Sequence, residues 1–166
     1  FINIEKDGIF IKAKDEKSLI NGFVTMLDCI SLDDEGNLQI RCCEIYEKPV
    51  IENRMIHFCV FPDTELWELE RFVRLCGALK HSHIVIEFWG MLKYDCLSEL
   101  SWSHGFDKKL IKPIIRQAKD LGIEVIPMFN HWGHASQSRV CHGKHVVLNQ
   151  NPKLGYLFGE DGWCWN

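Results

Sequence analysis

The stretch IEVIPMFNHWGHASQSR, residues 123–139, decides the fold predicted for this chain. It begins as an apolar run and continues without a break into a polar loop. The loop carries an amide, two imidazoles and an indole, on Asn130, His131, Trp132 and His134. Gly122 marks the end of a preceding helix, so the apolar run is predicted to be a buried strand. Parallel α/β proteins hold ligands at the carboxyl ends of their strands, and the loop is therefore a predicted ligand site.

Two further apolar runs, 55–61 and 83–89, precede this strand, and the segments 66–79 and 107–121 between them have helical spacing. This alternation predicts a β-α-β-α-β series with right-handed crossovers and a parallel three-stranded sheet. Three strands cannot close a barrel, which needs about eight. The expected fold class is therefore α/β, either a small open sheet or the first three strand–helix units of a (β/α)8 TIM barrel. The aromatic end of the chain, GWCWN, favours the barrel portion.

The first fifty residues have a different pattern. GIFIKA, residues 8–13, alternates like a strand, and 15–30 has helical spacing with Asp15 as a plausible N-cap. The run LQIRCCEIYE, 38–47, is predicted to be one strand. We expect residues 1–50 to be the end of an N-terminal α+β domain and 51–166 to be the N-terminal part of a barrel. Residues 140–166 lack clear periodicity and are expected to be loop-like.

Composition excludes several classes of partner. The formal net charge is −4, with acidic and basic residues interspersed, so a nucleic-acid surface is not expected. No apolar run approaches the roughly 18 to 20 residues that cross a bilayer, so no membrane partner is expected. The eight cysteines form no CxxC pair, and no signal-peptide pattern precedes them, which favours a reduced, cytoplasmic protein.

Polar and aromatic side chains at predicted strand ends are the candidate site residues. Glu87 and Trp89 end the second strand, and Asn130 and Trp132 follow the third. Indole rings beside acids and amides suit sugars, because rings stack on C–H faces while polar groups bind hydroxyls. The alternative for Glu87 is a pair with a buried Arg or Lys. Arg54, at the start of the first strand, must face either water or a polar cavity.

No cofactor and no metal are expected. Three histidines after the third strand could in principle approach one another, but carboxylate or cysteine partners at ligand spacing are missing. These histidines are His134, His142 and His145.

The order of these pieces resembles glycoside hydrolase family 20, the β-N-acetylhexosaminidases. ENRMIHFCVF resembles the first barrel strand of that family, with Arg54 at the position of an arginine that holds sugar hydroxyls. LERFVRLCGALKHSHIVIEFW resembles the first helix and second strand, and GIFIKAKDEKSLINGFVTMLDCI resembles the end of the small N-terminal domain. DKKLIKPIIRQAKDLGIEVIPMFNHWGHAS resembles the stretch around the family's Gly-His pair, which His134 matches.

The resemblance implies a catalytic barrel that removes terminal N-acetylhexosamine by substrate-assisted retention. The acetamido oxygen of the substrate attacks the anomeric carbon, an Asp orients it, and a Glu acts as acid and then base. That Asp-Glu pair follows the fourth barrel strand in the family, so we expect it beyond residue 166 and expect this chain alone to be inactive. His134 would support the catalytic apparatus by tuning a neighbouring carboxylate, and Arg54 would bind the terminal sugar.

The chain also departs from the family pattern at several acids. Met128 and Asn130 stand where the family has Glu and Asp, and Cys59 stands at an Asp position. Glu87 occupies a His position, and Gly90 replaces the Asp expected to partner the histidine. These departures keep open a non-catalytic, barrel-derived carbohydrate-binding protein. A third reading is an unrelated parallel α/β enzyme. An isolated piece with an open sheet edge is further expected to self-associate.

Overall fold

A parallel three-stranded sheet forms the centre of the molecule. The computed structural model describes residues 1–128 and 146–159. The strands lie in the order β6-β7-β8, with both neighbouring pairs parallel. Their bounds are β6 Met55–Val60, β7 His83–Phe88 and β8 Glu124–Met128. Two crossover helices connect them, α2 Leu66–Ala78 and α3 Lys108–Asp120. The predicted β-α-β-α-β series is confirmed, whereas its place in a larger barrel stays a prediction.

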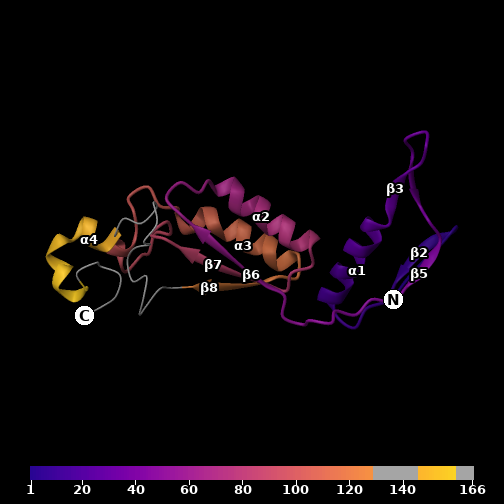
Figure 1. Cartoon of the computed structure of the whole chain (residues 1–166), viewed down its shortest axis with the longest axis horizontal. Coiled ribbons are helices and arrows are strands. Elements are labelled where there is room, and N and C mark those ends of the chain that lie inside the picture. Colours follow the sequence, from indigo (N-terminus) through magenta and orange to yellow (C-terminus); the bar gives the residue numbers. More distant parts are fainter. Residues whose placement is uncertain (129–145, 160–166) are drawn as a thin grey trace.

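Both helices pack on one face of this sheet (Figure 1). Side chains along a strand alternate between its two faces, and Ile84 and Ile86 of β7 are at most 1% exposed. They pack with the apolar stripe of α2, which includes Leu69 and Val73, and with Ile114 of α3. Burying one such side chain stabilises the fold by about 1.5–3 kcal/mol. The intervening residues of the strands therefore project to the opposite face, away from both helices.

The ends of the two helices follow local rules. α2 begins after Glu65, where Glu65 and Glu68 form a capping box. The helix begins at the first residue of the predicted segment 66–79. Just before it, Thr64 accepts a hydrogen bond from the Phe61 backbone N–H through Oγ1. α3 ends as predicted, with Gly122 in the left-handed region at φ +70°. The backbone N–H of Gly122 donates to the Lys119 carbonyl at 2.9 Å.

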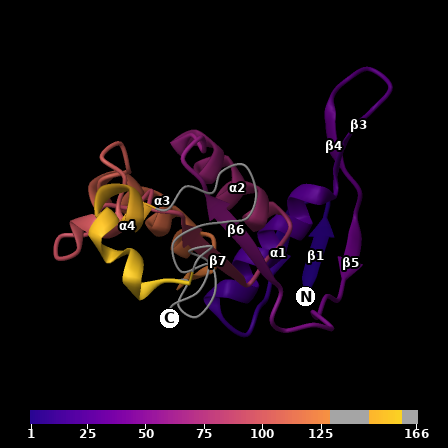
Figure 2. The same ribbon diagram turned by 60° about the vertical axis from the view of Figure 1, so that its left-hand side comes forward.

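The N-terminal part is a separate α+β layer built on an antiparallel sheet. The strand order is β2-β1-β5, and a two-stranded hairpin, β3-β4, projects away from it (Figures 1 and 2). The bounds are β1 Ile2–Glu5, β2 Gly8–Ile11, α1 Glu16–Asp28, β3 Ile30–Leu32, β4 Leu38–Ile40 and β5 Cys43–Ile45. The Asp15 carboxylate caps α1 by accepting from the Ser18 backbone N–H at 2.8 Å, as predicted.

Three details of this layer differ from the sequence prediction. The run 38–47 is not one strand, because β4 pairs with β3 while β5 pairs with β1. Ile30, predicted to close the helix, instead opens β3, and the strand Ile2–Glu5 was not predicted at all. All three differences concern strand pairing, which local periodicity does not record.

The described part of the C-terminal region is helical rather than loop-like, so that prediction is wrong for residues 146–157. It contains α4, Val146–Gln150, and a 3-10 helix, Pro152–Leu157. A second 3-10 helix, Ser98–Leu100, precedes α3. Val146, Val147 and Phe158 bury together against Leu100 and Trp102. Packing stabilises these short helices, which are too short to show a periodic pattern. None of the helices in residues 1–128 and 146–159 has the length and apolar character required to cross a membrane.

Removing a core side chain from β7 tests this architecture. Ile84 is fully buried between β7 and the helices, so we expect Ile84→Ala to lower the free energy of unfolding by about 2–5 kcal/mol. Urea denaturation followed by circular dichroism measures the change. Leu75→Ala, at a position of α2 that is 53% exposed, is the matched control and should cost less than about 1 kcal/mol. Equal losses in the two variants would contradict the assigned helix-facing side of β7.

Candidate functional site

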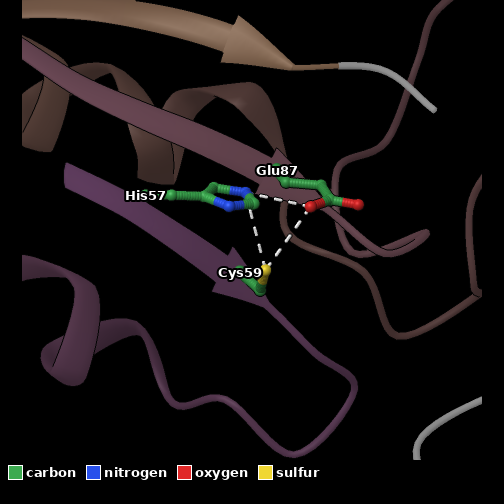
Figure 3. Close-up of side chains that lie close together, drawn as sticks. All are labelled: His57, Cys59 and Glu87. Carbon is green, nitrogen blue, oxygen red and sulfur yellow. Dashed lines mark hydrogen bonds and ion pairs between the residues drawn. The ribbon is translucent and has the colours of Figure 1, made fainter. Parts of the chain in front are cut away.

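A polar cluster lies on the face of the parallel sheet opposite the helices. It consists of His57 and Cys59 from β6 and Glu87 from β7, whose side chains point toward one another (Figure 3). His57 Nε2 lies 2.9 Å from Glu87 Oε2. The Cys59 thiol donates to the same carboxylate oxygen at 3.4 Å, and its sulfur lies 3.6 Å from His57 Nε2. We call these three residues the His-Cys-Glu cluster.

Strand register produces this arrangement. Cys59 pairs with Glu87 in the parallel β6–β7 ladder, so their side chains leave the same face side by side. His57 precedes Cys59 by two residues, and the period of two returns its imidazole to that face. Because Val60 and Phe88 end the two strands, the cluster lies near their carboxyl ends. This is the edge where parallel α/β proteins bind ligands.

Burial and charge set the electrostatics of the cluster. The Glu87 side chain is 6% exposed, whereas that of His57 is 42% exposed, so the cluster has a buried acidic end and an open imidazole end. Burial raises the pKa of the Cys59 thiol, and the neighbouring Glu87 charge and its hydrogen bond raise the pKa further. Hydrogen bonding to the Trp89 side chain acts in the opposite direction. Cys59 is therefore favoured as a neutral thiol that donates to the carboxylate.

Aromatic and glycine residues shape the chain just beyond the cluster. The Trp89 indole stacks on Phe61 with ring centroids 5.7 Å apart, joining the segments that follow β7 and β6. Gly90 has φ +73°, and a Cβ there would lie 2.8 Å from Cδ1 of Trp102. An acidic side chain at position 90 would therefore require both a strained backbone and displacement of Trp102.

The predicted site residues fall into three groups. Glu87 and Trp89 lie together at the carboxyl end of β7, and within residues 1–128 and 146–159 Glu87 pairs with His57. The buried Arg or Lys considered from the sequence stays a prediction. Asn130, Trp132 and His134 lie outside the described residues. Their roles, like those of Glu87 and Trp89 as sugar ligands, stay predictions.

Arg54 lies at the other end of the sheet. It precedes β6, and its guanidinium donates to the backbone carbonyls of Lys80 at 2.8 Å and Ile51 at 2.7 Å. Its backbone N–H donates to the Ser82 hydroxyl oxygen at 2.7 Å. The structure therefore does not bring Arg54 to the His-Cys-Glu cluster, and this placement does not support the prediction that Arg54 binds a sugar.

Two cluster members are not among the predicted site residues. The sequence prediction does not include His57, and it names Cys59 only as standing at an Asp position of the family. The sequence does contain a signal for both residues. His57 and Cys59 are two positions apart in MIHFCV, so their side chains share one face of the strand. Glu87 falls at the corresponding position along the next strand. Pairing the two runs in parallel register would have placed all three side chains together.

Comparison with known proteins places this fold in a single structural class. Neither a family model nor a curated protein matches the sequence. Solved structures do match: the family 20 exo β-N-acetylglucosaminidase of Vibrio harveyi, in complex with N-acetylglucosamine, has a TM-score of 0.77 at 16% identity. The β-N-acetylhexosaminidases of Bacteroides fragilis and Streptomyces coelicolor give TM-scores of 0.77 at 19% identity and 0.73 at 17% identity.

These matches cover 98% to 99% of this chain but only 30% to 35% of the three solved chains. The chain thus spans about a third of their length. Its succession of an α+β layer and a parallel α/β unit is a fold found within glycoside hydrolases. More specifically, it is the fold of the corresponding part of family 20 β-N-acetylhexosaminidases, as the sequence resemblance predicted.

The electrostatics of Cys59 can be tested by thiol alkylation in metal-free buffer. Glu87→Gln removes the negative charge beside the thiol, so we expect the pKa of Cys59 to fall. At a fixed, mildly alkaline pH the thiolate fraction then rises, and alkylation should accelerate by roughly threefold or more. Peptide mass spectrometry resolves Cys59 from the exposed Cys42 and from the buried Cys76, whose pKa burial raises to about 11.

Glu124→Gln is the matched control for this change. Glu124 lies at the start of β8, 72% exposed and paired with His83, so its loss should leave the Cys59 rate unchanged. An unchanged Cys59 rate in Glu87→Gln, or an equal rise in both variants, would contradict the assigned coupling.

Proposed function

We propose that this chain is part of a glycoside hydrolase that removes terminal N-acetylhexosamine by the substrate-assisted retaining route. The observation that carries the proposal is the coincidence of two features. The fold matches family 20 enzymes over nearly the whole chain, and the buried Glu87 and the indole of Trp89 lie at the carboxyl edge of the parallel sheet. The matching Vibrio harveyi structure holds N-acetylglucosamine.

The chemistry of this edge suits a sugar. A ring such as Trp89 stacks on the C–H face of a pyranose, and a carboxylate such as Glu87 accepts hydrogen bonds from its hydroxyls. In the proposed site Asn130 and Trp132 add further sugar contacts, and His134 supports the catalytic carboxylates. The Asp-Glu pair of the family mechanism has no counterpart in the sequence of residues 51–166, so Glu87, Trp89, Asn130 and Trp132 are assigned to substrate binding and His134 to a supporting role.

The second candidate is a barrel-derived protein that binds carbohydrate without hydrolysing it. Gly90 favours this candidate, because it stands where the resemblance expects an Asp and the structure leaves no room there for a side chain. Met128, at a position where the resemblance expects a Glu, is the last residue of β8 and is 38% exposed. An acid-poor edge of this kind can retain sugar contacts while losing the chemical step.

Hydrolysis by the full-length protein distinguishes the two candidates. We expect release of the chromophore from an aryl N-acetyl-β-glucosaminide, with no release from the matching β-glucoside, because substrate assistance requires the acetamido group. Absence of release, together with measurable N-acetylglucosamine binding, would reject the hydrolase and leave the binding protein. Absence of both would reject both candidates.

Sugar binding at the carboxyl edge is tested on the 166-residue chain. Saturation-transfer NMR titration with N-acetylglucosamine should show an affinity that Trp89→Ala lowers by about fivefold, because loss of one stacking ring costs on the order of 1 kcal/mol. Tyr46→Ala, which removes a 79% exposed aromatic side chain of the N-terminal layer, is the control and should bind as the parent does. Equal binding by Trp89→Ala and the parent would remove Trp89 from the site.

A further inference from the structure

The His-Cys-Glu cluster combines three side chains that share one property: each offers an atom that binds zinc. Imidazole nitrogen, cysteine sulfur and carboxylate oxygen are the three donor types used by protein zinc sites. Their donor atoms lie within 4.8 Å of one another. We propose that His57, Cys59 and Glu87 form a three-ligand site for a divalent zinc-type cation.

The distances between the donors fit one metal ion. Zinc lies about 2.0–2.2 Å from nitrogen and oxygen ligands and about 2.3 Å from sulfur, so tetrahedral donors are separated by roughly 3.3–3.6 Å. The nitrogen–sulfur and sulfur–oxygen separations here are 3.6 and 3.4 Å. The nitrogen–oxygen separation is 2.9 Å, the length of a hydrogen bond. Opening that one contact by less than about 1 Å gives the tetrahedral arrangement.

The scaffold holds the donors in place. All three belong to two adjacent strands in fixed register, and Cys59 and Glu87 are direct partners in the ladder. The backbones therefore need no movement, and only side-chain rotation separates the hydrogen-bonded form from the coordinated form. On binding, the Cys59 thiol releases its proton to solvent, and the cation takes the place of that proton.

The arrangement also defines the kind of site. Three protein ligands leave a fourth tetrahedral position open, which is typical of zinc sites that hold a water molecule or a substrate oxygen. Glu87 is the buried member of the cluster and His57 is the exposed one, so solvent reaches the cluster from the His57 side. Among residues 1–128 and 146–159, no other group of three such donors meets the same distance criterion. The inference concerns the cation alone and does not rest on the proposed sugar function.

Cobalt(II) is the probe that tests this site, because cobalt–thiolate bonds give a near-ultraviolet charge-transfer band. We expect the 166-residue chain to develop this band with a stoichiometry of one and zinc to abolish it by competition. Cys59→Ser should lose the band, and His57→Gln and Glu87→Gln should weaken cobalt binding by on the order of 100-fold or more. His57 is half-exposed, so its substitution tests the site even if a change at the buried Glu87 disturbs folding.

Cys42→Ser is the matched control, since Cys42 is an exposed cysteine outside the cluster and should leave the band intact. Circular dichroism confirms that each variant is folded. A band retained by Cys59→Ser, or a chain that shows no band at millimolar cobalt, would overturn the proposal. A band that Cys59→Ser removes while His57→Gln and Glu87→Gln bind as tightly as the parent would also overturn it, because a single thiolate is not the site proposed.

Discussion

The alternating faces of β7 are the constraint on which the rest of the molecule depends. Burial of Ile84 and Ile86 against α2 and α3 fixes which way the central strand faces. A strand cannot bury one set of side chains without presenting the other set to the opposite side. The orientation of Glu87 is therefore a consequence of core packing, and a slip of one residue would exchange the core isoleucines with the acid. The hydrophobic core and the polar cluster are two results of one register.

The sequence predicted most of the parallel unit, because its signals are local. Apolar runs, helical spacing and the left-handed Gly122 are each readable within about fifteen residues, and they placed β6, β7, β8, α2 and α3 correctly. The antiparallel layer was predicted less well. Residues 38–47 divide between two sheets because β4 pairs with the neighbouring β3 while β5 pairs with β1 at the start of the chain, and periodicity carries no information about partners.

The candidate site was likewise predicted only in part. Glu87 and Trp89 could be recognised because strand ends in α/β folds are informative positions. Their neighbours His57 and Cys59 could not be recognised from composition alone, because a cysteine in an apolar run is usually a small hydrophobe. What changes the interpretation is the carboxylate of the next strand, 3.4 Å from the sulfur. Arg54 is a predicted site residue that the structure places elsewhere. It precedes the first residue of β6, so it lies at the amino end of the sheet, away from the cluster.

The junction between the two layers has a consequence of its own. Lys80 pairs with Glu47 at 2.7 Å, and Lys17 of α1 reaches the carbonyl of Ser82. All of these contacts lie where the parallel strands begin, and the His-Cys-Glu cluster lies where they finish. One end of the sheet thus holds the N-terminal layer and the other holds the cluster, and the length of a strand separates them. Sequence change at the cluster end need not loosen the attachment of the N-terminal layer, so this architecture allows its chemistry to drift while its shape persists.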